Sequence, residues 1–538
     1  MSEGPLLTVV VPVYNGGDEI VANVDVIRRA VADGIPGADV ELIVVSDGSI
    51  DGTAERLLES RGEQGIRVLH YDRNLGKGYA VKAGALAAHG DWIALVDADL
   101  DLDPGSIPGY LEAARREGLD LAIGSKRHPD SVVQYPRSRR AASWCYQQLN
   151  RALFRLDVRD TQVGLKVFSR RVADDVLPLL LVKRYAFDLE LLAVAKSLGY
   201  DRIRELPVRL DYRFAGSGVG SLAVLGALWD TAAIFYRLRI LRTYERKRRL
   251  FHGAAAAAPE QLPLVSLIGD PQAAALLDYP RLAASGELVA ILGTEARPAG
   301  NWVTAAVPFF ANPDVAAVVV PTVSPLGGSL GRRVAAAVLE SRLGAGSRRS
   351  SYLPGNVRLV ADHVAESIVL RREDYAAVSG AGVEPDRVVA WLAEQGRRTI
   401  YTPDTSVSAP PPALVRPHLS ATFRHGRARG AAARRSRGAS LSGATALSLT
   451  PAAAALAGAA LVLAGGSGRT AGFVLLVAYG AALAVSGIHA AVRFRSPAVG
   501  LLQPFAVVAS QATYLGGFVR GLIERPKASR QEARALAS

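Results

Sequence analysis

Apolar and polar positions follow a regular pattern over the first 215 or so residues. Apolar runs predict strands at Leu6–Val13, Val40–Val45, Ile66–Tyr71, Trp92–Val96 and Leu119–Ile123, and helical patterns lie at Asp18–Ala32 and Lys77–Ala88. Strands separated by helices predict a mostly parallel sheet covered on both faces, which is an α/β fold. Ligands of such sheets bind beyond the carboxyl ends of the strands, and the polar motifs of this chain follow those ends.

The pattern changes after residue 218. Val219–Tyr236 is almost wholly apolar, and basic residues are frequent from Arg237 to Arg249. This predicts an amphipathic helix in a membrane interface, with a core helix and a solvated basic end as the alternative. An alanine-rich linker, Gly253–Pro259, then leads to a second α/β pattern over residues 260 to 430.

Three long apolar segments follow at about 447–466, 471–492 and 499–519, each close to the length that spans a bilayer. The arginines of 424–437 place the N-terminal side of the first segment in the cytoplasm. Basic residues after the second and third segments also prefer the cytoplasm, so two spans and a hairpin fit better than three spans. We therefore expect a multi-pass protein of the cell membrane with its N-terminal part in the cytoplasm.

Composition narrows the class of partner. The 538 residues carry a net charge of +13, and 49% of them are hydrophobic. Because the arginines crowd beside the apolar segments, an anionic membrane surface explains the charge, and we expect no nucleic acid partner. Cys145 is the only cysteine, which excludes an intramolecular disulfide and a cysteine-based metal site. The first residues lack the pattern of a signal peptide.

Two carboxylates, Asp97 and Asp99, follow the strand Trp92–Val96 with one residue between them. At a strand end they can point into one cleft, and oxygen ligands of this kind suit Mg²⁺ or Mn²⁺. A metal there can neutralise a departing nucleotide diphosphate. Alone, this pattern is a weak signal, and a solvated acidic turn is its other interpretation.

Three further motifs strengthen it. Val11-Pro12-Val13-Tyr14-Asn15 ends the first strand, Asp47-Gly48-Ser49-Ile50-Asp51-Gly52-Thr53 ends the second, and Arg73-Asn74-Leu75-Gly76-Lys77-Gly78 opens a helix whose amides can approach phosphate. In this order the motifs resemble family 2 glycosyltransferases of the GT-A fold. The resemblance implies that Asp97 and Asp99 hold the metal, and that a nucleotide-sugar binds at Pro12, Tyr14, Asn15, Asp47, Gly48, Ser49, Asp51, Lys77, Asp97 and Ala98. Ser46 stands where many members have an aspartate.

Later motifs narrow the resemblance. They are Gly124-Ser125-Lys126-Arg127-His128, Asp160-Thr161-Gln162-Val163-Gly164-Leu165-Lys166, Tyr185-Ala186-Phe187-Asp188-Leu189-Glu190 and Glu205-Leu206-Pro207-Val208. The series looks like dolichyl-phosphate β-glucosyltransferases and bacterial polyprenyl-phosphate glycosyltransferases over about residues 5 to 218. It implies inverting transfer of a hexose, glucose from UDP-glucose, to a polyprenyl phosphate, with a GDP-sugar donor left open. It also implies catalytic roles for Asp99, Arg127, Gln162 and Asp188.

The nature of the acceptor decides which residues the reaction needs. A lipid phosphate is already anionic at neutral pH, so it needs positive charge more than a base. Candidates are Arg127, Arg137, Arg139 and Arg140, although exposed arginines could instead face lipid headgroups. A hydroxyl acceptor, on a glycolipid or an envelope polysaccharide, would need a base, either Asp188 or Glu190. Both acids could equally be structural.

The second module echoes the first without its metal site. Gly286–Trp302 resembles Gly90–Asp99, yet the metal position holds Gly293, Thr294 and Glu295. We expect a degenerate GT-A-like domain that serves assembly, acceptor presentation or membrane docking. The alternative is a second active enzyme that uses Glu295, Glu384 and Asp386.

We expect a catalytic domain at 1–218, the interfacial helix and basic segment at 219–252, a linker at 253–259, the degenerate domain at 260–440, a membrane region at 441–525 and a basic tail at 526–538. A homo-oligomer is possible. A non-catalytic membrane scaffold is the competing class of function, and the intact motifs of the first module argue against it.

Overall fold

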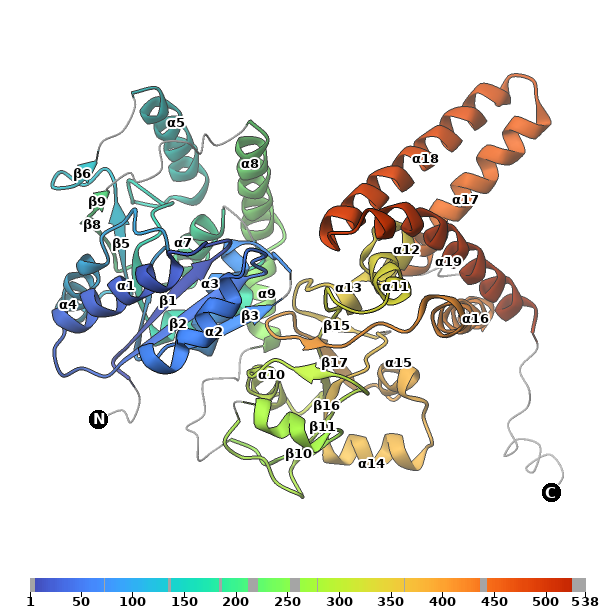
Figure 1. Cartoon of the computed structure of the whole chain (residues 1–538), viewed down its shortest axis with the longest axis horizontal. Coiled ribbons are helices and arrows are strands. Elements are labelled where there is room, and N and C mark those ends of the chain that lie inside the picture. Colours follow the sequence, from blue (N-terminus) through green and yellow to red (C-terminus); the bar gives the residue numbers. More distant parts are fainter. Residues whose placement is uncertain are drawn as a thin grey trace.

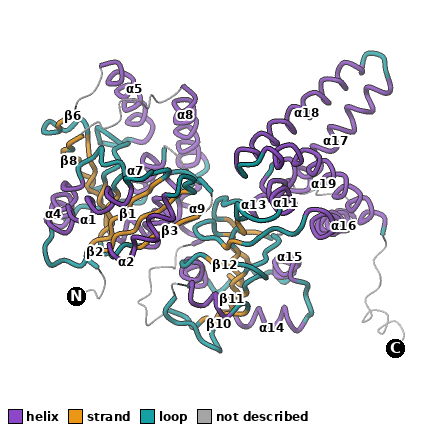
Figure 2. The backbone as a smooth tube through the Cα atoms, viewed as in Figure 1, coloured by secondary structure: helices purple, strands orange, loops and turns teal. Residues whose placement is uncertain are grey.

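The computed structural model describes residues 5–71, 73–133, 137–182, 186–210, 221–251, 262–277, 279–361, 363–435 and 443–524. The chain forms an N-terminal α/β module, a second module built on its own sheet, and a set of C-terminal helices (Figure 1). Strands lie inside both modules, and in the described residues the C-terminal part consists of helices and the loops that connect them (Figure 2).

The first module contains a seven-stranded sheet in the order β3-β2-β1-β4-β7-β5-β8. Its strands, with the small pair β6 and β9, are β1 Leu7–Val13, β2 Val40–Asp47, β3 Arg67–Tyr71, β4 Trp92–Leu95, β5 Leu121–Ser125, β6 Val132–Val133, β7 Lys166–Ser169, β8 Ile203–Pro207 and β9 Arg209–Leu210. In the large sheet β7 alone runs antiparallel to its neighbours. The carboxyl ends of β1, β2 and β4 therefore meet at one edge. The strand predictions are confirmed to within two residues.

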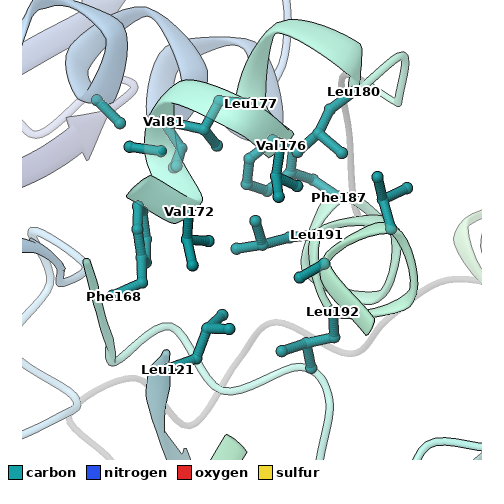
Figure 3. Packing of buried hydrophobic residues seen from close by; sticks show 14 of the residues in the cluster. Val81, Leu121, Phe168, Val172, Val176, Leu177, Leu180, Phe187, Leu191 and Leu192 are labelled. Atoms are coloured by element: carbon teal, nitrogen blue, oxygen red, sulfur yellow. The ribbon is translucent and has the colours of Figure 1, made fainter. Parts of the chain in front are cut away.

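Helices cover both faces of this sheet. They are α1 Ile20–Gly34, α2 Thr53–Gln64, α3 Lys77–Ala87, α4 Ile107–Glu117, α5 Arg137–Phe154, α6 Arg170–Val176, α7 Phe187–Ser197, α8 Ser221–Phe235 and α9 Thr243–Phe251. Figure 3 shows Leu191 and Leu192 of α7 beside Val172 and Val176 of α6 in one of the two buried clusters. This core fixes α7, and with it the acids that begin that helix.

The segment predicted to lie in the membrane interface, residues 219–252, is not one continuous α-helix. A π-helical turn, Tyr236–Ile240, separates α8 from α9. Ile234 and Tyr244 are fully buried against the first module, whereas Trp229 is 78% exposed. One side of the segment is therefore part of the core, and the contact of its other side with a membrane stays a prediction.

The second module contains a six-stranded sheet in the order β10-β11-β16-β13-β17-β15. With a small sheet of β12, β14 and β18, its strands are β10 Val265–Ile268, β11 Leu288–Ile291, β12 Arg297–Pro298, β13 Val315–Val319, β14 Thr322–Val323, β15 Arg358–Val360, β16 Ile368–Arg371, β17 Arg398–Tyr401 and β18 Val407–Ser408. Its α-helices are α10 Trp302–Ala306, α11 Leu330–Glu340, α12 Arg342–Ala345, α13 Arg349–Tyr352, α14 Arg372–Gly380 and α15 Val388–Glu394.

The first five strands of this sheet repeat part of the first one. The order β10-β11-β16-β13-β17 matches β1-β4-β7-β5-β8, and β16, like β7, is antiparallel to both neighbours. The match extends to one hydrogen bond: Gly90 N donates to Thr8 Oγ1 over 2.8 Å, and Gly286 N donates to Ser266 Oγ over 2.7 Å. In the described part of the second module, no strands take the places of β2 and β3.

Four helices form the C-terminal part: α16 Leu419–Arg435, α17 Gly443–Ala464, α18 Gly468–Arg493 and α19 Pro497–Ile523. The α17–α18 hairpin projects away from both modules (Figure 1). Among the described residues, α18 and α19 are long and apolar enough to cross a bilayer. The topology of two spans and a hairpin stays a prediction.

Both glutamines of the third apolar segment form hydrogen bonds inside the protein. Gln503 donates to Ser486 Oγ, and Gln511 donates to the carbonyl of Leu343 and accepts from Tyr479. Because buried amides need such partners, these bonds explain how α19 carries two glutamines in an apolar sequence. One face of α19 is thus attached to α11, α12 and α18.

Candidate active site

Two loops at the carboxyl ends of β1 and β2 are tied together. Asn15 N donates to Ser49 Oγ over 3.1 Å, Ile50 N donates to Asn15 Oδ1 over 2.9 Å, and Gly17 N donates to Asp51 Oδ2 over 2.8 Å. Asn15 has a φ of 54°, a conformation that asparagine tolerates better than most residues. These predicted nucleotide-binding residues therefore shape one another, and Pro12 lies buried at the end of β1 beneath them.

Asp47 holds the loop that precedes α3. Its two carboxylate oxygens accept from Leu75 N at 2.7 Å and Gly76 N at 2.9 Å. Gly48 lies beside it with a φ of 64°, and a Cβ there would stand 2.1 Å from the carbonyl carbon of Arg73. Only glycine permits this approach. Asp47 is 2% exposed, so its part in nucleotide binding, which stays a prediction, would be to fix the loop.

Lys77, the first residue of α3, reaches across to Asp97. Its Nζ lies 2.6 Å from Oδ1 and 2.8 Å from Oδ2 of that carboxylate. Asp99 is exposed, and its Oδ1 accepts from Asp101 N. Ala98 lies between the two acids, and its carbonyl accepts from Asn23 over 3.1 Å.

The electrostatics of this cluster favour a cation. Although Asp99 is exposed at the edge, nearby protein atoms displace part of the water around its carboxylate, and this desolvation and the neighbouring Asp97 raise the pKa of Asp99, because both disfavour its negative charge. Burial alone would lower the pKa of Lys77, but Asp97 and Asp188 outweigh it and hold that pKa above its usual range. The ammonium group of Lys77 therefore lies in a region that the neighbouring carboxylates make electrostatically negative.

These donors fit a hard divalent metal ion. Two carboxylates beside an open edge leave room for water and diphosphate oxygens, which Mg²⁺ usually keeps as ligands. Among the described residues, no three acidic, histidine or cysteine side chains stand close enough to hold a metal ion together, so such an ion would depend on its substrate for the remaining ligands.

The antiparallel strand β7 and the loop before it each contribute one residue from the other side. A Cβ on Gly164 would stand 2.2 Å from Asp97 Oδ2, so this glycine lies directly against the carboxylate. Lys166 is 1% exposed, and its Nζ lies 2.6 Å from Asp188 Oδ1. Lys166 belongs to the motif that begins at Asp160, and the sequence alone assigns it no role. A lysine inside an apolar strand was the available signal, because a buried cation needs a partner.

The other predicted catalytic and acceptor-binding residues lie on the loops after β5 and before β7 and on α5. Gln162 is exposed on the loop before β7, and Arg127 is half-buried after β5. Asp160 accepts from the amides of Lys126 and Gln162, which ties these two loops together. Arg137, Arg139 and Arg140 lie on α5, but their side chains fall outside the described residues.

Of the two interpretations of Glu190, a base or a structural residue, its contacts fit the structural one. It is fully buried and accepts from Leu181 N and Val182 N, each at 2.8 Å, and from Arg237 and Tyr244. Burial raises its pKa, and these donors offset part of that rise. Its place is beneath the site, where it attaches α8 and α9 to α7. Of the two candidate bases, Asp188 is the one whose charge acts on Lys77.

The equivalent edge of the second module is built differently. Register with β4 places Gly293 at the position of Asp97 and Glu295 at that of Asp99. The carboxylate of Glu295 pairs with Arg332 over 3.1 Å. Glu384 is exposed, and the side chain of Asp386 falls outside the described residues.

Comparison with known proteins agrees with this geometry. The model of the family "Glycosyl transferase family 2" matches residues 8–177. A dolichyl-phosphate beta-glucosyltransferase from Trichomonas vaginalis is 32% identical over 238 residues, which are 40% of this chain and 68% of that relative. The chain therefore belongs to glycosyltransferase family 2, and the expected GT-A fold of the first module is confirmed.

Other relatives match shorter parts. Glycosyltransferase AglD from Haloferax volcanii is 33% identical over 38% of this chain and 33% of its own length. A dolichyl-phosphate beta-glucosyltransferase from Drosophila melanogaster is 35% identical over 36% of this chain and 63% of its own length. The chain thus spans less than two thirds of these two relatives. Glucosyl-3-phosphoglycerate synthase from Mycobacterium tuberculosis, at 21% identity over 43% of this chain and 79% of that one, has a TM-score of 0.31, too low to carry an argument.

Proposed function

We propose that the chain transfers glucose from UDP-glucose to a polyprenyl phosphate at the cytoplasmic face of a membrane, with inversion at the anomeric carbon. The single observation that carries the proposal is the cluster of Lys77, Asp97 and Asp99 at the edge of the sheet, in a chain whose relatives include dolichyl-phosphate beta-glucosyltransferases. The long apolar helices α18 and α19 support attachment to the membrane.

Asp97 and Asp99 would hold Mg²⁺ or Mn²⁺, which supplies positive charge to the diphosphate as it leaves. Lys77 stands at the N-terminus of α3, where it and the first amides of the helix can stabilise a phosphate oxygen. Asp47 keeps the preceding loop in place, and the loops around Asn15 and Ser49 would receive the base and ribose.

The state of Asp188 favours a phosphate acceptor over a hydroxyl. Its carboxylate already accepts from Lys166, so it is engaged as the partner of a buried cation. A hydroxyl acceptor would need a free base, whereas a phosphate oxygen attacks without one. Arg127, with the arginines of α5, would bind that phosphate.

We also propose that the second module is a degenerate transferase domain. The repeated strand order supports common descent with the first module, and Gly293 together with the Glu295–Arg332 pair supports loss of the metal site. Without strands in the places of β2 and β3, its described part offers no counterpart of the base-binding loops.

A transfer assay tests the proposal. The full chain in detergent with Mn²⁺ would be given radiolabelled UDP-glucose, GDP-mannose and UDP-GlcNAc separately, with polyprenyl phosphate as acceptor. We expect a labelled, acid-labile lipid from UDP-glucose alone, absent in Asp99→Ala and retained in Asp25→Asn, whose carboxylate pairs with Arg28 on α1. Release of free sugar with no labelled lipid would contradict the proposed acceptor.

A further inference from the structure

Glu340, the last residue of α11 in the second module, lies among three arginines from distant parts of the chain. Its side chain is 5% exposed and pairs with Arg73 of the first module and with Arg493 at the end of α18, the latter at 3.3 Å. Arg349 donates to its backbone carbonyl over 2.8 Å. The C-terminus of a helix carries partial negative charge, so Glu340 and the end of α11 attract these cations together.

Arg73 begins the loop that Asp47 holds in place. One side of this loop lies against Asp47 and Gly48, and the other side is joined to Glu340 through Arg73. Four residues after Arg73 the chain reaches Lys77, which contacts Asp97. A short, continuous stretch therefore connects a carboxylate of the second module to the proposed metal site.

A second contact joins the C-terminal helices to the loop after β2, which is also expected to bind the nucleotide-sugar. Arg495, in the corner between α18 and α19, donates to the carbonyl of Ile50 over 2.6 Å. Arg493, two residues earlier, is the cation shared with Glu340. The corner next to the apolar helices thus touches the loop after β2 directly and the loop before α3 through Glu340.

We propose that Glu340 is a positioning residue of the nucleotide-sugar site: it holds Arg73, and so shapes residues 73–76 for the diphosphate. The inference rests on the proposed function. One carboxylate lies between two guanidinium groups that are 14% and 9% exposed, and it offsets one of their two positive charges. Without it, two poorly solvated like charges would repel each other, and Arg73 would move with its loop.

Kinetics of the full chain test this role. In Glu340→Gln we expect the KM for UDP-glucose to rise roughly threefold to thirtyfold, with kcat and the KM for polyprenyl phosphate unchanged. Glu340→Asp keeps the charge and should recover most of the donor KM. Glu394→Gln is the matched control, because Glu394 forms an exposed ion pair with Arg387 on the same module.

Hydrogen–deuterium exchange gives a readout that does not depend on sugar transfer. The amides of Leu75 and Gly76, which Asp47 protects, should exchange faster in Glu340→Gln than in Glu394→Gln. Arg73→Gln breaks the same contact from the other side and should give the same result if the first variant fails to fold. Faster exchange in a protein that transfers no sugar would sink the proposed function and leave the coupling standing. Unchanged exchange together with an unchanged donor KM would overturn the role of Glu340.

Discussion

Gly164 and Asp97 lie so close that a single added methyl group cannot fit between them: a Cβ at residue 164 would stand 2.2 Å from Asp97 Oδ2. We predict that Gly164→Ala displaces the carboxylate and lowers the transfer rate roughly a hundredfold, since a misplacement of about 1 Å at a reacting group has that effect. The steady-state rate at saturating UDP-glucose and polyprenyl phosphate measures it.

Gly109→Ala is the matched control for that substitution. Gly109 lies within α4 with open space around the position of a Cβ, so alanine there should leave the rate unchanged and stabilise the helix slightly. A Gly164→Ala enzyme with the wild-type rate would show that Asp97 need not stay where it is.

The raised pKa of Asp99 predicts that its charge costs stability in metal-free buffer. A carboxyl whose pKa is higher in the folded state destabilises that state once the pH exceeds its unfolded pKa. Asp99→Asn should therefore melt at the same temperature as the wild type or slightly higher near pH 7, while losing activity. Adding Mn²⁺ should raise the melting temperature of the wild type and not that of the variant. An equal Mn²⁺ shift in both would place the ion elsewhere.

The ion pair between Lys82 and Asp404 should contribute to the stability of the whole chain. The two side chains are 8% and 7% exposed and lie 2.7 Å apart, one in each module. Asp404→Asn leaves a buried ammonium without its counter-charge, and we expect a loss of about 3 kcal/mol in the free energy of unfolding by urea. Lys82→Met combined with Asp404→Leu should restore most of it. A single variant as stable as the wild type would contradict this account.

We predict that the second module loses stability at acidic pH because of the buried imidazole of His363. Burial, with the nearby Arg358 and Arg348, lowers its pKa from 6.5 to about 3. The unfolded chain takes up this proton first, so the contribution to stability is fully present above about pH 6.5 and is lost as the pH falls towards 3. Melting temperatures at pH 7 and pH 5 should differ less in His363→Phe than in the wild type. Equal differences would assign the acid sensitivity to other groups.

The sheet edge and its motifs could be predicted because they are local in sequence. Apolar runs ended where β1, β2 and β4 end, and the polar residues that follow a strand must lie beyond it. The positions of Asp97, Asp99 and Lys77 at one edge came from that reasoning. Asp188 and Glu190 stand in one helical motif, and either could be a base or a structural residue, because the motif does not reveal which side chain faces the ligand and which faces the core.

Contacts between modules could not be predicted in this way. Arg73 and Glu340 are separated by 267 residues, and neither stands in a pattern that names its partner. The motif that contains Arg73 predicts a loop whose amides approach phosphate, and it gives no sign that a carboxylate of the second module holds the arginine. The sequence shows that Gly293 takes the position of Asp97 in the second module. The matching strand order of the two sheets became visible only in the structure.

The hydrogen bond from Tyr79 to the carbonyl of Pro403 joins residues 324 positions apart in the sequence. Arg493, which pairs with Glu340, follows Pro403 in the chain. A ribosome adds between roughly 5 and 20 residues per second, so the helix that begins with Lys77 would wait about 15 seconds to a minute for its partner in the second module. The contact between Arg73 and Glu340 gains its second arginine only after α18 has been synthesised. Donor binding would thus mature late in translation, when the apolar helices are already available to the membrane.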